Sequence, residues 1–92
     1  MEDSELTNEQ IEKIFKQIGK NVKKYRNKKN ISQLALSLQM GHKAVGTVSM
    51  AEICINNKHF NIKHLAQISK ILNVKICNFF EGVDEIIEKE EK

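Results

Sequence analysis

Most of the residues that could do chemistry in this chain are basic, and they gather in its middle. Residues 13–80 hold thirteen lysines and arginines and a single acid, Glu52, whereas residues 1–12 and 81–92 are net acidic. The formal charge of +3 therefore conceals a basic body between two acidic ends. Such a body attracts a polyanion, so we expect nucleic acid as the partner. The alternative is that the lysines only keep the surface solvated.

The cysteines and histidines are too scattered to predict a metal site. Cys54, His59 and His64 recur every five residues with His42 upstream, which matches no usual zinc spacing. Cys54 and Cys77 form no CxxC pair, and we expect both to be free, buried thiols. The sequence also lacks a nucleophile–base pair, a phosphate-binding glycine loop and paired carboxylates. We therefore expect no metal, no cofactor and no enzymatic activity.

The apolar pattern predicts an all-α bundle of about five helices that positions these residues. Strong helix formers dominate, proline is absent, and apolar residues recur at helical spacing. We expect helices over residues 7–28, 32–39, 44–53, 62–72 and 76–80, with one more at 84–90 as an option. They would form a single domain over residues 1–92, with its core at about 8–81 and acidic ends at 1–6 and 83–92. No apolar run approaches the ~20 residues of a membrane span, and the acidic start is unlike a secretory signal. We thus expect a cytoplasmic protein.

Local signals predict where several of these helices begin and end. Thr7 with Gln10 is typical of a capping box. N-caps are expected at Ser32 and Asn61, and helix ends at Asn30, Gly41 and Asn73. The last three are residues that tolerate positive φ.

The stretch from Ile31 to Glu52 indicates two short helices around a turn at Gly41. This is a helix-turn-helix, whose second helix can enter the DNA major groove. The apolar residues of the first helix would share one face, and those of the second would point inward: Leu34, Ala35 and Leu38, then Val48 and Ala51.

Taken together, these segments resemble the Xre/Cro family of bacterial and phage helix-turn-helix regulators, which have the lambda-repressor-like fold. The resemblance covers roughly residues 15–81 and rests on the order and spacing of its motifs. These are Ile18-Gly19-Lys20, Tyr25-Arg26, Ile31-Ser32-Gln33-Leu34-Ala35, Thr47-Val48-Ser49-Met50-Ala51-Glu52 and Asn73-Val74 through Phe79-Phe80. It implies a sequence-specific regulator of transcription that binds duplex DNA as a homodimer, with the helix at 44–53 in the major groove.

The resemblance and the charges together predict the DNA-binding residues. Gln33 would contact a backbone phosphate and brace the reading helix, and Glu52 would be structural, bonded to a basic residue or to the backbone of the fold. Residues expected near the bases are His42, Lys43, Ala44, Val45, Thr47 and Met50. Further phosphate contacts are expected from Asn57 and Lys58, and from Lys20, Lys23 and Arg26 on the first helix.

Two departures from the family pattern favour an alternative function. The expected reading helix is largely apolar, with few of the bidentate donors that discriminate bases, and the turn before it is longer. The alternative is a protein-interaction module, or an antitoxin, with weak or non-specific DNA binding and a toxin or other regulator as protein partner. The last apolar residues could form a dimer face or equally belong to the core: Ile76, Phe79, Phe80, Val83, Ile86 and Ile87.

Overall fold

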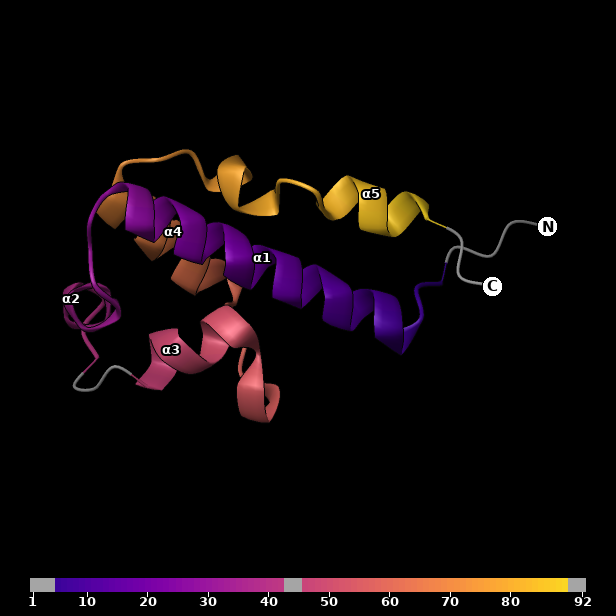
Figure 1. The fold of residues 1–92 in the computed structure, drawn as a ribbon, viewed down its shortest axis with the longest axis horizontal. Helices are drawn as coiled ribbons and strands as arrows, with labels where there is room; N and C mark the ends of the chain where they lie inside the picture. Colours follow the sequence, from indigo (N-terminus) through magenta and orange to yellow (C-terminus); the bar gives the residue numbers. More distant parts are fainter. Residues whose placement is uncertain (1–4, 43–45, 90–92) are drawn as a thin grey trace.

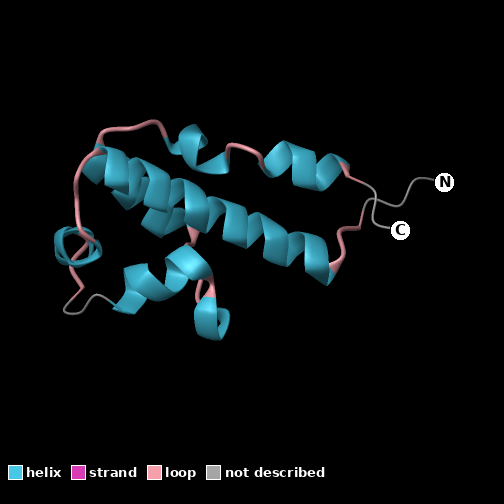
Figure 2. Cartoon of the chain, in the orientation of Figure 1, coloured by secondary structure: helices cyan, strands magenta, loops and turns pink. Residues whose placement is uncertain are grey.

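The long helix α1 (Asn8–Lys28) is the element against which most of the chain packs (Figure 1). The structure is a computed structural model, which we describe over residues 5–42 and 46–89. After α1 come α2 (Gln33–Gln39), α3 (Gly46–Ile53), the 3-10 helix η1 (Ile55–Asn57), α4 (Ile62–Leu72), the 3-10 helix η2 (Ile76–Phe80) and α5 (Val83–Glu88). The described residues contain no strand, so the predicted all-α bundle is confirmed (Figure 2). Within those residues no helix is long and apolar enough to cross a membrane.

The predicted helix ends are largely confirmed, because they depend on local hydrogen bonds. In the capping box of α1, the Gln10 N–H donates to Thr7 Oγ1 at 3.0 Å and the Thr7 N–H donates to Gln10 Oε1 at 2.9 Å. Ser32 and Asn61 cap α2 and α4 through their side chains. Positive φ angles close the helices as predicted, at Asn30, Gly41 and Asn73.

Two segments differ from the prediction at residue level. The described part of α3 begins at Gly46, and residues 44–45 of the expected helix lie outside the described residues. The helix expected at 76–80 is a 3-10 helix, and the optional helix of the tail forms as α5 after Gly82, whose φ is +84°.

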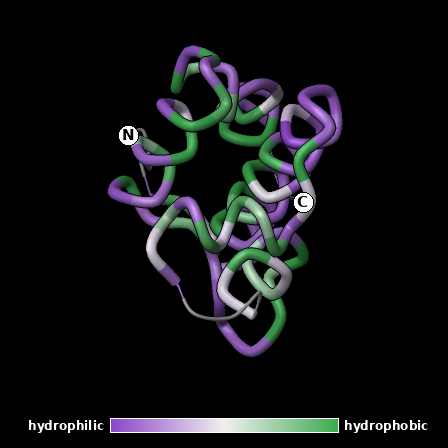
Figure 3. The backbone as a smooth tube through the Cα atoms, turned by 90° about the vertical axis from the view of Figure 1, so that its left-hand side faces the viewer, coloured by the Kyte–Doolittle hydropathy of each residue, from purple (hydrophilic) through white to green (hydrophobic). Residues whose placement is uncertain are grey.

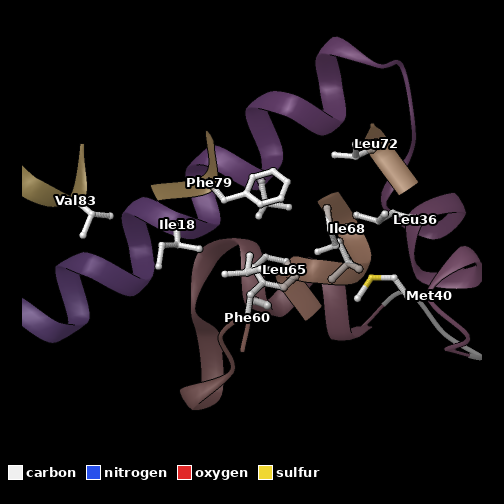
Figure 4. Packing of buried hydrophobic residues seen from close by; sticks show 12 residues of the cluster. Ile18, Leu36, Met40, Phe60, Leu65, Ile68, Leu72, Phe79 and Val83 are labelled. Carbon is white, nitrogen blue, oxygen red and sulfur yellow. The ribbon is translucent and has the colours of Figure 1, made fainter. Parts of the chain in front are cut away.

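The hydrophobic core joins α1, α2, α3, α4, η2 and α5 (Figure 4). In α2 it takes Leu36 and Met40, whereas Leu34 and Leu38 share the opposite, solvent-facing side at 50% and 56% exposure. The inward direction of Val48 and Ala51 is confirmed, since both are buried. Apolar and polar positions interleave along the helices, as the hydropathy colouring in Figure 3 shows.

Some apolar predictions are wrong. Cys77 is exposed rather than buried, because it precedes Phe79 by two residues and so lies on a different side of a helix with three residues per turn. Cys54 is half-buried, and both thiols are free. Phe79 and Val83 are core residues, which removes them from the suggested dimer face.

The C-terminal elements return along one side of α1, and α3 crosses the other side (Figure 1). Asn21 Nδ2 donates to the carbonyl oxygens of Phe79 at 2.9 Å and Glu81 at 2.8 Å. Lys24 pairs with Glu81 at 2.8 Å. The acidic helix α5 is therefore held away from α3, and it does not cover the face that α3 presents.

Candidate nucleic-acid interface

A buried polar network fixes α3 against α1 and α2. The Arg26 guanidinium donates from Nε to Glu52 Oε2 at 2.7 Å and from Nη2 to Glu52 Oε1 at 3.1 Å. Its Nη1 donates to the Ile31 carbonyl at 2.8 Å, and Gln33 Nε2 donates to Glu52 Oε1 at 2.8 Å. A bidentate pair of this kind fixes the relative orientation of the two side chains as well as contributing energy. The Glu52 carboxylate thus joins α1, α2 and α3 through hydrogen bonds.

This network corrects one prediction and confirms another. Arg26 is 6% exposed and donates a hydrogen bond from each of its three side-chain nitrogens, so it is not available to a DNA phosphate as predicted. The predicted structural role of Glu52 is confirmed, because its carboxylate is buried against that arginine. The half-buried Gln33 braces α3 through Glu52, while its predicted phosphate contact stays a prediction.

A glycine lets α1 and α3 approach each other closely. A Cβ at Gly19 would lie 2.5 Å from the Glu52 carbonyl oxygen and 2.9 Å from the Ala51 carbonyl oxygen. Both are backbone atoms, so the last turn of α3 rests directly on the backbone of α1. The network and this contact together hold α3 in one orientation.

That orientation leaves one stripe of α3 facing outward. Val48, Ala51 and Glu52 are buried, and the opposite side carries residues at i, i+3, i+4 and i+7 spacing: Gly46, Ser49, Met50 and Ile53. Ile53 is 55% exposed, and Met50 is partly exposed. Thr47 lies at the edge of the stripe. Two of the predicted base-contacting residues, Thr47 and Met50, are therefore accessible, whereas Lys43, Ala44 and Val45 lie outside the described residues.

His42 packs against the start of α4. Its ring packs edge-on against His64 at the start of α4, with centroids 6.0 Å apart, and its Nε2 is buried without a hydrogen-bond partner. The predicted contact of His42 with a base edge stays a prediction, with the ring half-buried in this position. Burial, and to a lesser degree the neighbouring His42, lowers the pKa of His64.

The two residues that were predicted to contact phosphate after α3 lie at a groove. Asn57 and Lys58 line a hollow of about 660 Å³ between the first half of α1 and the connection from α3 to α4. Phe15 and His59 stack in its wall with centroids 3.8 Å apart. Glu9 and Glu12 line the same hollow, so Lys58 lies among side chains of both charges. Burial raises the pKa of the Cys54 thiol there.

Exposed lysines border α3 along α1. Lys16 and Lys23 lie three residues before and four residues after Gly19, and Lys20 lies between them, so the three form a stripe along the edge of α1 next to α3. We call these three residues the lysine stripe. Lys20 and Lys23 are among the predicted phosphate contacts, whereas Lys16 and Ile53 are not, although their spacing from Gly19 and Met50 places them beside the predicted residues.

The arrangement presents a positively charged edge of α1 beside the outward stripe of α3. Among residues 5–42 and 46–89, no three His, Cys, Asp or Glu side chains lie close enough to share a metal ion. In comparisons with known proteins, no family model, no curated protein and no solved structure matches this chain.

Proposed function

We propose that this chain is a cytoplasmic DNA-binding regulator of the Xre/Cro type, which places the outward stripe of α3 in the major groove of duplex DNA. One observation carries the proposal. Glu52 is the only acid in residues 13–80, and its side chain is buried and neutralised by Arg26. Over the described part of that segment, the surface therefore exposes lysines and no carboxylate.

The position of the C-terminal acids supports the same proposal. Glu81 pairs with Lys24, and the acids of α5 lie on the side of α1 away from α3. The lysine stripe borders α3 with exposed side chains, so a polyanion that touched α3 would meet it. Lysine neutralises backbone phosphates without reading sequence, which fits a positioning role. A homodimer on DNA follows from the small area that one short helix can bury.

A second function is favoured by the exposed apolar side chains. Leu34, Leu38 and Ile53 are each at least half exposed, and large exposed apolar residues are typical of protein-binding surfaces when they gather. Under this alternative, the chain is a protein-interaction module or an antitoxin, with a toxin or another regulator as its partner. Its DNA binding would then be weak or non-specific.

The test is the salt dependence of binding to a random duplex, measured by fluorescence anisotropy. Removal of one lysine–phosphate interaction flattens the slope of log K against log salt by about 0.9. We expect Lys20→Ala/Lys23→Ala to flatten it by about 2. The matched control is Lys70→Ala/Lys75→Ala, which removes the same charge from exposed positions on α4 and before η2 and should leave the slope nearly unchanged. Equal effects of the two pairs, or no binding at ~50 mM salt, would favour the protein-partner alternative.

A further inference from the structure

The outward stripe of α3 has an unusual composition for a surface that reads bases. It consists of Gly46, Ser49, Met50 and Ile53, and the Ser49 hydroxyl already donates to the Gly46 carbonyl at 3.3 Å. No arginine, lysine, asparagine or glutamine side chain occurs anywhere in Gly46–Ile53. The stripe therefore cannot form the bidentate pairs that identify guanine or adenine.

Apolar side chains can recognise one feature of the major groove, which is the C5 methyl group of thymine. Met50 is flexible and Ile53 is branched, and both project from the same side of α3. A Cβ at Gly46 would meet nothing within 4 Å, so the first described turn of α3 leaves space for a base pair to approach closely. We propose that α3 of this chain selects duplex DNA by contacting thymine methyl groups through Met50 and Ile53.

This inference rests on the proposed function and adds the class of target, which is duplex DNA with thymines in the contacted register. The lysine stripe beside α3 argues for DNA as the occupant of the apolar surface, because a neutral protein partner would not require it. Thr47 at the edge of the stripe adds one hydroxyl, which tolerates several bases.

The decisive experiment removes the methyl group and nothing else. A duplex enriched from a random pool at ~100 mM salt is compared with the same duplex carrying deoxyuridine for thymine, which keeps every hydrogen-bonding group. We expect affinity to fall about four-fold for each contacted thymine, which corresponds to ~0.8 kcal/mol for one buried methyl-sized group. In a second comparison, one contacted thymine is replaced with cytosine or with 5-methylcytosine. The 5-methylcytosine duplex should bind more tightly than the cytosine duplex, because its methyl group lies at the same place in the groove.

Two variants connect the effect to α3. Met50→Ala and Ile53→Ala should each move the thymine-to-uracil affinity ratio towards one, while circular dichroism shows an unchanged fold. Leu38→Ala is the matched control, because it removes a similarly exposed apolar side chain from α2. The inference is overturned if the wild-type protein binds the enriched duplex and its uracil version equally. It is also overturned if Leu38→Ala lowers the ratio as much as the α3 variants do.

The two proposals fail in different ways. Absence of binding to any duplex at ~50 mM salt overturns the proposed function and this inference with it. Tight, salt-sensitive binding with equal affinity for thymine and uracil duplexes overturns the inference alone.

Discussion

Gly19→Ala tests how closely α3 rests on α1. In an ordinary helix interior this change stabilises a protein by about 1 kcal/mol, because alanine is the better helix former. Here the new Cβ would lie 2.5 Å from the Glu52 carbonyl oxygen, 2.9 Å from the Ala51 carbonyl oxygen and 3.0 Å from the Glu52 carbonyl carbon. All three are backbone atoms, so no side chain can rotate to make room.

The magnitude follows from the size of that overlap. Helices α1 and α3 must separate by roughly 1 Å before the new Cβ is at an ordinary van der Waals distance from the α3 backbone. Overpacking of a close-packed contact costs about 1–3 kcal/mol, and we expect the upper end because both partners are backbone. The shift also stretches the pair between Arg26 and Glu52. After the gain in helix propensity, the net loss of unfolding free energy is ~2 kcal/mol, or roughly 10 °C in Tm.

The assay is urea unfolding followed by far-UV circular dichroism, with Gly46→Ala as the matched control. The control makes the same chemical change where a Cβ meets nothing within 4 Å, so it should be neutral or stabilise the protein by up to ~1 kcal/mol. Opposite signs for the two variants are the expected result. If Gly19→Ala is as stable as Gly46→Ala, the close contact between the helices is refuted.

Three further predictions follow from buried or partly buried groups. Glu52→Gln should lower the unfolding free energy by about 3–5 kcal/mol in urea titrations, because it leaves the Arg26 guanidinium buried without its counter-charge. A loss of less than ~1 kcal/mol would contradict this prediction. Asn21→Ala should cost about 1–3 kcal/mol in the same assay and speed hydrogen exchange in η2 and α5, since two carbonyl oxygens lose their donor; unchanged exchange there would count against it. The lowered pKa of His64 means that the unfolded state takes up a proton more readily, so stability is complete above about pH 6.5 and falls as the pH drops below it. His64→Gln, which keeps an acceptor at the capping-box position, should reduce that pH dependence between about pH 7.5 and about pH 5.5, and an equally steep dependence would refute the assignment.

Helix ends could be predicted from the sequence because they depend on neighbours within a few residues. The capping box at Thr7 and Gln10 and the left-handed asparagines at positions 30 and 73 need no tertiary information. The same holds for the burial of the Val48 and Ala51 side chains, which follows from helical spacing.

Long-range pairing could not be predicted in the same way. Arg26 belongs to a run of basic residues and was predicted to be a surface contact, yet its partner lies 26 residues away in sequence. In α2, Leu34 and Leu38 lie on one side and Leu36 on the other, so periodicity alone does not decide which side is buried. The His42 ring packs against His64 on α4, a tertiary contact that the spacing of the two residues does not reveal.

The central claim is that the outward stripe of α3 contacts duplex DNA, and amide chemical-shift mapping tests it most directly. Isotope-labelled protein would be titrated with a short duplex at low salt, and the shifted amides placed on the fold. We predict the largest changes at Thr47, Met50 and Ile53, smaller changes at the lysine stripe, and none in α5. Changes centred on α5 or on the groove that contains Phe15, with α3 unaffected, would contradict the claim.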